Sequence, residues 1–285
     1  MRRSLLFIPS NTPAMLQNAD VFSADSVIFD LEDAVLLSEK DAALQLLNQF
    51  LKMFPLGSIE KIVRINGLDS TLGFTDLTTI VSDQIDTIML PKATKETTLL
   101  LVQVLTKIEK KMKMQKKIGI IPIIETASSV LEVSEIARIE RVSGLLLGAE
   151  DLSTDLEVER TESGLEILLS RQMVILAAKG NMIDAIDTPY TNPSNPDGLE
   201  KDSLYAKSLG MNAKACIHPV QIDIVNQVFS PKESEIEYAK KILAANEAAI
   251  LEHKGAFSVD GKMIDKPIIE RAKKLIEKAR LWNLL

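Results

Sequence analysis

Short aliphatic runs alternate with longer amphipathic segments over most of the chain. Each run is rich in Val, Ile and Leu and ends in polar residues, and apolar positions in the segment after it recur with helical spacing. This alternation predicts strands that are each followed by a helix. The eight predicted strands lie in SLLFIPS (4–10), SVIFDLED (26–33), KIVRIN (61–66), TIMLPKA (87–93), IGIIPIIETA (118–127), VSGLLLGAEDL (142–152), MIDAIDTPY (182–190) and AKACIHP (213–219).

Eight strand–helix units in succession, without a second strand pattern, predict one α/β domain: a TIM (β/α)₈ barrel over residues 1–230. The pattern changes after Pro231. Residues 233–254 and 267–282 predict two helices, and the segment AFSVDGKMID between them is polar and contains a glycine. These residues cannot be barrel strands. We expect residues 231–285 to form a C-terminal helical extension that caps the barrel, contacts another subunit or closes over the active site as a lid.

Charged residues occur where the predicted strands end. Strands of a parallel barrel are buried on both sides, which excludes charge from their middles, and the active sites of this fold form at their carboxyl ends. We therefore expect the active site at this end of the barrel. His218, which precedes a proline, is expected to be a structural strand-end histidine rather than a catalytic one. The polar strand-end residues are Asp30, Glu32, Asp33, Arg64, Asn66, Lys92, Glu125, Glu150, Asp151, Asp187 and His218.

Glu125 and Asp151 are the candidate metal ligands. They are 26 residues apart, close to the ~30 residues of one barrel unit, so they are expected at the ends of neighbouring strands. Carboxylate oxygens without Cys or His nearby favour Mg²⁺ or Mn²⁺ over Zn²⁺, and Mg²⁺ leaves positions for water and for a chelating substrate such as a 2-oxo acid. The alternative for each carboxylate is a structural role, as a helix cap or in a local ion pair.

The neighbouring strand ends supply further polar groups. Arg64 suits a substrate carboxylate or a developing enolate oxygen, and it can at the same time form an ion pair with a carboxylate of the second strand. Asp30 and Glu32 are expected to orient Arg64 or to hydrogen-bond metal-bound water, and Asp33 is expected to cap a helix. Lys92 lacks the apolar surroundings of a Schiff-base lysine, so a hydrogen-bonding role is favoured.

Composition and charge exclude several kinds of partner. A formal net charge of -7 and a pI near 5.1 disfavour nucleic-acid binding, and the lysine-rich stretch at residues 107–117 predicts a solvated helix end. Cys216 is the single cysteine, so no internal disulfide can form. The first apolar run is too short for a signal peptide, and no run approaches the ~18 residues of a membrane helix, so we expect a cytoplasmic protein.

Together the motifs resemble one known family, the citrate-lyase-β-like and malyl-CoA or citramalyl-CoA lyases of the HpcH/HpaI aldolase group. The resemblance covers nearly the whole chain. It implies a TIM barrel, homotrimeric or hexameric, that uses Mg²⁺ to cleave a 3-hydroxyacyl thioester in a retro-Claisen reaction. It rests on the order and spacing of RRSLLFIPS, FDLEDAV, VRIN, LPK, IETA, GAEDL, the ERT segment at 159–161, AIDTPY, IHPVQ and DGKMIDKPIIERAK.

The resemblance also implies roles for single residues. Glu125 of IETA and Asp151 of GAEDL would bind the metal, and Arg64 of VRIN would bind substrate and stabilise the enolate. Arg3 would line the thioester channel. Asp265 of KMID would transfer protons from a lid that closes over a neighbouring subunit's site. The residues expected to contact substrate are Arg64, Arg3, Glu125, Lys92 and Glu32.

Three functions remain open at this point. The first is a citrate lyase β-type subunit that cleaves a citryl thioester on an acyl carrier protein to oxaloacetate and acetyl thioester, in a complex with a transferase subunit. The second is a free-standing lyase for malyl-CoA or citramalyl-CoA, and the third is a noncatalytic scaffold. The ERT segment and the short chain favour the first. Departures from the family pattern, which leave the thioester open, occur at Ser10, Pro189, Asn192 and Ala213.

Overall fold

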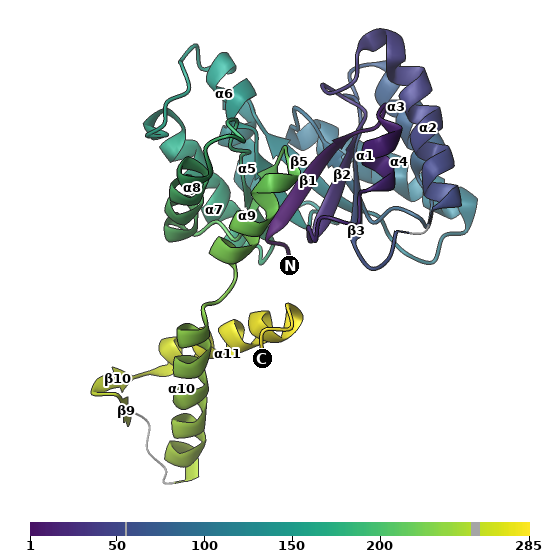
Figure 1. Ribbon diagram of the computed structural model, residues 1–285. Helices are drawn as coiled ribbons and strands as arrows, with labels where there is room; N and C mark the ends of the chain where they lie inside the picture. Colours follow the sequence, from purple (N-terminus) through teal and green to yellow (C-terminus); the bar gives the residue numbers. More distant parts are fainter. Residues whose placement is uncertain (55, 252–256) are drawn as a thin grey trace. The chain divides into compact units, whose positions relative to one another are not determined.

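The computed structural model describes residues 1–54, 56–251 and 257–285. In it the eight predicted strands pair in sequence order and close into one parallel barrel, which confirms the predicted fold (Figure 1). The strands are β1 (Ser4–Pro9), β2 (Ser26–Asp30), β3 (Glu60–Arg64), β4 (Thr87–Leu90), β5 (Gly119–Ile124), β6 (Gly144–Leu147), β7 (Asp184–Asp187) and β8 (Ala213–Cys216).

Alternate residues of these strands fill the barrel interior. Their apolar side chains form one buried cluster that includes Leu5 and Ile62. At the amino ends of the strands a polar layer closes this core, because Arg2 donates hydrogen bonds to Glu60 at 2.5 and 2.6 Å and to Asp184 at 2.9 Å. This end of the barrel is thus sealed by a structural ion-pair network, and the carboxyl ends remain for the chemistry.

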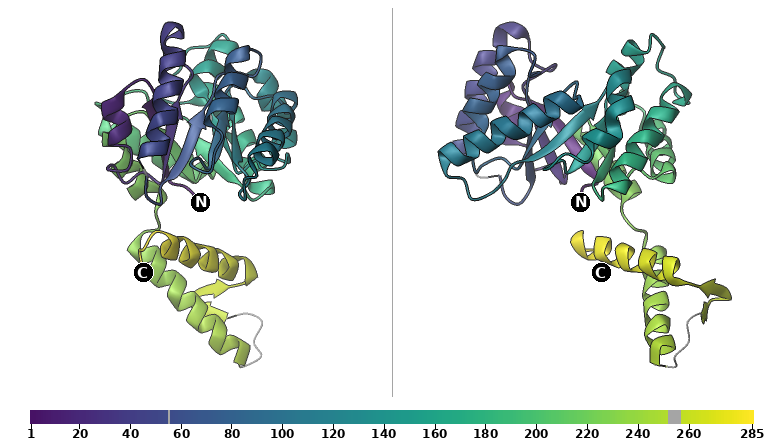
Figure 2. Two further views of the ribbon diagram at one scale, coloured as in Figure 1. Left: turned by 90° about the vertical axis from the view of Figure 1, so that its right-hand side faces the viewer. Right: turned by 180° about the vertical axis from the view of Figure 1, so that it is seen from behind.

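Helices surround the barrel strands (Figure 2). Capping boxes at Thr94 and Thr126 begin two of them, and Lys113, with a φ of 57°, ends the helix that contains most of the lysine-rich stretch. The helices are α1 (Pro13–Gln17), α2 (Lys40–Met53), α3 (Thr71–Ile80), α4 (Lys95–Met112), α5 (Ala127–Ile136), α6 (Ala149–Asp155), α7 (Leu168–Gly180), α8 (Pro196–Leu209) and α9 (Ile222–Phe229), with 3₁₀ turns η1 (Leu37–Glu39), η2 (Leu165–Ile167) and η3 (Pro219–Gln221).

One helix of the barrel is not predicted by the hydrophobic pattern. α6 begins two residues after β6 ends, within the segment that the sequence assigns to the sixth strand. Asp151 therefore lies in the first turn of a helix rather than at a strand end. Gly148 alone separates β6 from α6, and α6 is too short for its helical spacing to stand out in the sequence.

The chain divides into two compact units, Met1–Val228 and Phe229–Leu285. The second unit contains α10 (Glu233–Leu251), β9 (Phe257–Val259), β10 (Lys262–Ile264) and α11 (Lys266–Leu281). Ile236, Ile264 and Ile276 belong to its buried core. The last residues of the helix predicted over 233–254 lie outside the described residues. In the part of the chain that the structure describes, no helix is long and apolar enough to span a membrane.

The strands β9 and β10 form an antiparallel hairpin where the sequence analysis expects only a polar connection. Asp260 and Gly261 connect them, with φ values of 48° and 77°. Two consecutive positive φ values are typical of the tight turn that an Asp-Gly pair favours between antiparallel strands. The Asp-Gly pair was therefore a usable signal for this hairpin.

Candidate functional site

Arg64, the last residue of β3, lies at the centre of a charged cluster at the carboxyl ends of the strands. Its guanidinium donates to both carboxylate oxygens of Asp30 on β2, at 2.7 and 2.6 Å, and Glu32 lies 2.9 Å from a terminal nitrogen. The Phe7 ring centroid is 5.0 Å from the guanidinium carbon. Burial disfavours the charge, but the hydrogen bonds with Asp30 raise the pKa of Arg64. Arg64 is a fixed cation that retains its charge.

Glu125 directly follows β5 and is 5% exposed. Its Oε1 accepts a hydrogen bond from the backbone N–H of Lys92 at 2.5 Å. Burial raises the pKa of Glu125 to about 8; the Lys92 hydrogen bond lowers this pKa, and the charges of Asp151 and Glu32 raise it further. The Glu125 carboxyl group thus lacks sufficient positive charge nearby.

Asp151 approaches Glu125 from the first turn of α6. A Cβ atom at Gly148 would lie 2.6 Å from Glu125 Oε2, so the absence of a side chain at this position lets the start of α6 pass close to Glu125. The Ala149 N–H donates to Thr188 Oγ1 at 3.3 Å and holds the helix start. Within the described residues, no hydrogen bond or ion pair engages the Asp151 carboxylate.

Two adjoining cavities open at this cluster. The first, of about 140 Å³, is lined by Arg64 and by four carboxyl groups, those of Asp33, Glu125, Glu150 and Asp151. The second, of about 410 Å³, shares Phe7, Asp33, Arg64 and Pro189 with the first and continues past Pro9 and Ile217. Of the described residues that line either cavity, Arg64 alone carries a positive charge.

Burial also acts on Glu32. It raises the pKa of this carboxyl group to about 7; the Arg64 charge lowers the pKa, and the nearby Asp33 and Asp30 raise it again. Glu32 and Glu125, which interact through their charges at this end of the barrel, both have raised pKa values, and this marks a surplus of acidic groups over cations. Such clusters are typical of functional sites.

The oxygens of Glu125 and Asp151 fit a hard divalent cation. Among the described residues no three His, Cys, Asp or Glu side chains group into a complete metal site. Two carboxylates are nevertheless a sufficient protein contribution for Mg²⁺, which keeps water and substrate oxygens in its other positions. The donor set is oxygen only, and a divalent cation would supply the charge that the Glu125 carboxyl group lacks.

Residues 3–219 match the model of the HpcH/HpaI aldolase/citrate lyase family, which covers well over half of the chain. The chain belongs to this family. Residues 165–284 also match a model described as C-C bond lyase of the TIM-barrel fold. The resemblance inferred from the motifs is confirmed, and with it the predicted enzyme class, a carbon–carbon lyase.

Curated members of the HpcH/HpaI aldolase/citrate lyase family align with nearly the whole chain. The citrate lyase subunit beta of Leuconostoc mesenteroides subsp. cremoris is 38% identical over 292 residues, covering 100% of this chain and 95% of the relative. A (3S)-malyl-CoA thioesterase of Cereibacter sphaeroides is 33% identical over 277 residues, covering 97% of this chain and 94% of the relative.

Solved structures of Mycobacterium tuberculosis proteins share the fold. The protein CitE in complex with magnesium, acetoacetate and coenzyme A has a TM-score of 0.79 and 28% identity, covering 98% of both chains. A citrate lyase beta subunit complexed with oxaloacetate and magnesium has a TM-score of 0.69 and 28% identity, covering 81% of this chain and 97% of that chain.

The structure brings together most of the residues singled out from the sequence, but not all. Arg3 precedes β1 at the amino end of the barrel, where it donates to Asp25 at 2.9 and 2.7 Å. The length of β1 separates Arg3 from the cavities, so within one chain it cannot line the expected thioester channel. Asp33 does not cap a helix, because α2 begins only at Lys40, and it lies 3.5 Å from Arg64 instead.

The remaining candidates have local roles in the structure. Asp265 is the N-cap of α11 in the second unit, where it accepts a hydrogen bond from Ile268 N–H at 3.3 Å. His218 caps η3 through a hydrogen bond from Val220 N–H. Burial raises the pKa of Cys216 to about 12, which makes its thiol unreactive.

Three contributions to the site were missed from the sequence. Phe7 could have been found, because strand alternation places it on the same face of β1 as Leu5. Gly148 had a weak signal, as a glycine between an aliphatic run and two acidic residues. The backbone N–H of Lys92, a residue with a φ of 44° in the left-handed region, had no signal in the sequence.

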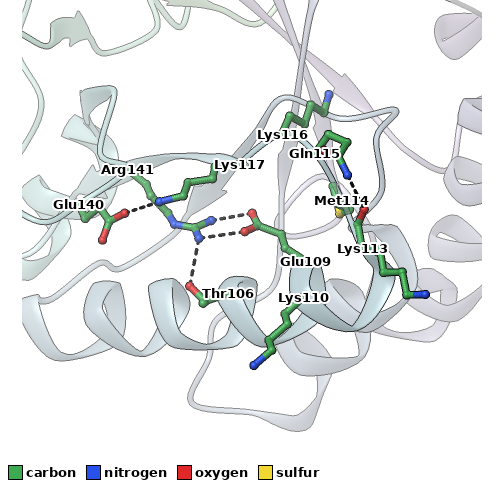
Figure 3. Close-up of a pocket in the computed structure, with 10 residues that line it drawn as sticks. All are labelled: Thr106, Glu109, Lys110, Lys113, Met114, Gln115, Lys116, Lys117, Glu140 and Arg141. Carbon is green, nitrogen blue, oxygen red and sulfur yellow. Dashed lines mark hydrogen bonds and ion pairs between the residues drawn. The ribbon is translucent and has the colours of Figure 1, made fainter.

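A third cavity, of about 480 Å³, lies at the other end of the barrel, between the end of α4 and the start of β5 (Figure 3). Three of the five cations that line it are paired with acidic residues: Arg141 with Glu109 at 2.6 and 2.9 Å, Lys117 with Glu140 at 2.9 Å and Lys116 with Asp86 at 3.0 Å. The side chains of Lys110 and Lys113 point in different directions (Figure 3). The lysine-rich stretch thus does not converge on an anion.

Proposed function

We propose that the chain is a Mg²⁺-dependent citryl-thioester lyase of the citrate lyase β-subunit type. One observation carries this proposal: the carboxyl groups of Glu125 and Asp151 line the same cavity without enough positive charge to compensate them. The fixed cation Arg64 lines that cavity as well. A retro-Claisen cleavage needs both parts: a metal for the hydroxy-acid portion and a cation for the thioester enolate.

Glu125 and Asp151 would hold the ion, and bound Mg²⁺ would act as a Lewis acid toward the hydroxyl oxygen that becomes the ketone of oxaloacetate. In the reaction the bond between the hydroxyl-bearing carbon and the carbon next to the thioester breaks. The hydroxyl group loses its proton, and the bonding electrons form the acetyl-thioester enolate. The enolate carbon takes up one proton, which balances the proton lost by the hydroxyl group, so no net proton is released or consumed.

Arg64 would stabilise the enolate oxygen. Asp30 holds the guanidinium on one edge and Phe7 lies against its face, so the remaining donors need little reorganisation as charge develops. Lys92 would support Glu125 through its backbone, and Glu32 would orient Arg64. We propose Asp265, contributed by a neighbouring copy of the chain, as the group that moves a proton at the acetyl carbon.

The thioester carrier is part of the proposal. We infer a substrate presented on an acyl carrier protein, with a transferase subunit as a further partner and a homotrimer or hexamer as the assembly. The similarity to a (3S)-malyl-CoA thioesterase favours a second candidate, a free-standing enzyme for malyl-CoA or citramalyl-CoA. Both candidates would use Glu125, Asp151 and Arg64 in the same way.

An assay of the isolated chain on matched thioesters separates these functions. Citryl, malyl and citramalyl thioesters, each on coenzyme A and on an acyl carrier protein, are incubated with and without Mg²⁺, and the released 2-oxo acid is measured. Preference for the citryl group on the carrier supports the first candidate, and preference for malyl-CoA or citramalyl-CoA supports the second. Absence of both cleavage and Mg²⁺-dependent oxaloacetate binding would support a noncatalytic scaffold.

A further inference from the structure

Lys40 occupies a position where its charge is unfavourable to its own helix. It is the first residue of α2, and the amino end of a helix repels cations. Its side chain is half-buried and turns back from α2. The ammonium donates to the backbone carbonyl oxygens of Leu31 at 2.9 Å and Glu32 at 2.8 Å. Lys40 therefore holds the turn that follows β2.

A second pair of residues holds the same turn from the side of β3. The buried Asn66 donates from Nδ2 to the Leu31 carbonyl oxygen at 3.1 Å and to Asp76 Oδ2 at 2.7 Å. The backbone N–H of Asn66 also donates to Asp76, at 2.9 Å. Two side chains thus fix the Leu31 carbonyl. The Glu32 carbonyl accepts from the backbone N–H of Val35 at 3.1 Å and, among the described residues, has Lys40 as its one side-chain donor.

The direction of the Glu32 carboxylate depends on this backbone. Its Oε2 atom is 2.9 Å from Arg64, yet within the described chain this buried oxygen has no hydrogen bond of good geometry. Attraction to Arg64 alone leaves several orientations open. The turn that carries the Glu32 backbone selects among them. Asp30 holds the N–H side of this turn, because its carboxylate accepts hydrogen bonds from the backbone N–H groups of Glu32 at 2.9 Å and Ala34 at 3.1 Å, and Lys40 holds its carbonyl side.

We infer that Lys40 is a positioning residue of the proposed lyase reaction. By donating hydrogen bonds to the carbonyl groups of Leu31 and Glu32, it keeps the Glu32 carboxylate next to Arg64. This inference rests on the proposed function. Without the ammonium, Asp30 still binds one edge of Arg64, but at the other edge the Glu32 carboxylate is no longer held in place and the more distant Asp33, at 3.5 Å, is the remaining anion. The guanidinium can then turn away from the enolate oxygen.

Lys40→Met keeps the aliphatic stem and removes the ammonium. We expect kcat for the citryl thioester to fall about tenfold or more, because a misaligned cation stabilises the transition state less. KM and the Mg²⁺ affinity should change little, and Lys40→Arg, which keeps charged donors, should recover part of kcat. Lys61→Met is the matched control: Lys61 donates to the Ile59 carbonyl at 3.2 Å, but at the amino end of the barrel. It should lower stability without changing kcat.

Combination with Glu32→Gln distinguishes positioning from a general structural effect. If Lys40 acts through Glu32, Lys40→Met lowers kcat in the wild type but not further in the Glu32→Gln background. An unchanged kcat in Lys40→Met, or an equal decrease in both backgrounds, overturns the inference. If Lys40→Met does not fold, Lys40→Gln takes its place in the cycle.

The same double-mutant cycle of Lys40→Met and Glu32→Gln can be measured by urea unfolding, which does not depend on catalysis. If the wild type cleaves no thioester, the proposed function fails, and the unfolding cycle still decides the role of Lys40. Non-additive effects of Lys40→Met and Glu32→Gln on the free energy of unfolding support the coupling, and additive effects refute it.

Discussion

Replacing Glu125 by Gln should stabilise the metal-free protein. The folded carboxyl group has a pKa of about 8 against an ordinary value of 4.5, because burial and the neighbouring carboxylates disfavour its ionised form. Below pH 4.5 the Glu125 carboxyl group does not lower the free energy of unfolding. As pH rises from 4.5 toward 8, it lowers that free energy by an increasing amount. At pH 7, with about 1.4 kcal/mol for each pH unit above 4.5, the cost is on the order of 3 kcal/mol. Glutamine keeps the acceptor for the Lys92 N–H and removes the charge.

Urea unfolding in EDTA, followed by far-ultraviolet circular dichroism, measures this effect. Dichroism is preferred to fluorescence because the one tryptophan, Trp282, lies in the C-terminal unit. The difference between Glu125→Gln and wild type should be about 3 kcal/mol at pH 7 and below about 1 kcal/mol at pH 5. Mg²⁺ should then raise the melting temperature of the wild type but not of Glu125→Gln.

Glu60→Gln is the control, and its effect on the free energy of unfolding should be opposite to that of Glu125→Gln. Glu60 is also a partly buried glutamate of the barrel, but although burial alone would raise its pKa, the hydrogen bonds from Arg2 lower it. Loss of its charge at pH 7 should destabilise the protein, because Arg2 would keep a buried charge with one partner fewer. If Glu125→Gln also destabilised the protein, or if its effect on the free energy of unfolding did not change between pH 5 and pH 7, the conclusion that the Glu125 charge is uncompensated would be wrong.

Three further predictions concern the same end of the barrel. Gly148→Ala should abolish the Mg²⁺-dependent rise in melting temperature, because the new Cβ would lie 2.6 Å from Glu125 Oε2; an unchanged rise would contradict this geometry. Ser10→Ala should stabilise the protein by about 1 kcal/mol in urea unfolding, because it removes a buried hydroxyl without a partner in the described chain. The apparent Mg²⁺ affinity, measured by calorimetry, should increase between about pH 6 and pH 8, because Glu125 must release its proton to bind the metal. A pH-independent affinity would exclude Glu125 as a ligand.

The barrel and the position of the active site could be predicted from the sequence. Parallel strands buried on both sides require long aliphatic runs, and the residues that end these runs must lie at one end of the barrel. That argument placed Arg64 and Glu125 correctly beside the cavities. The pairing of Arg64 with Asp30 also followed, because adjacent strands end in opposite charges.

The rest depended on features that residue type does not encode. Asp151 reaches the site from a helix because the chain turns at Gly148, and the helix that begins there, Ala149–Asp155, is too short for its spacing to be recognised in the sequence. Lys92 acts through a backbone N–H whose direction is set by φ. The expectation for Arg3 could have been avoided, because a residue that precedes a barrel strand lies at the amino end, away from the chemistry.

Release of oxaloacetate from a citryl thioester tests the central claim most directly. The wild-type chain, Glu125→Gln and Asp151→Asn are compared at saturating Mg²⁺ and in EDTA, with the oxaloacetate reduced by malate dehydrogenase and NADH. We predict that the wild type releases oxaloacetate only with Mg²⁺ and that both variants lose about three orders of magnitude in kcat, as expected when several kcal/mol of transition-state stabilisation by the metal is lost. A wild-type rate that is unchanged in EDTA, or a full rate in Glu125→Gln, would contradict the account.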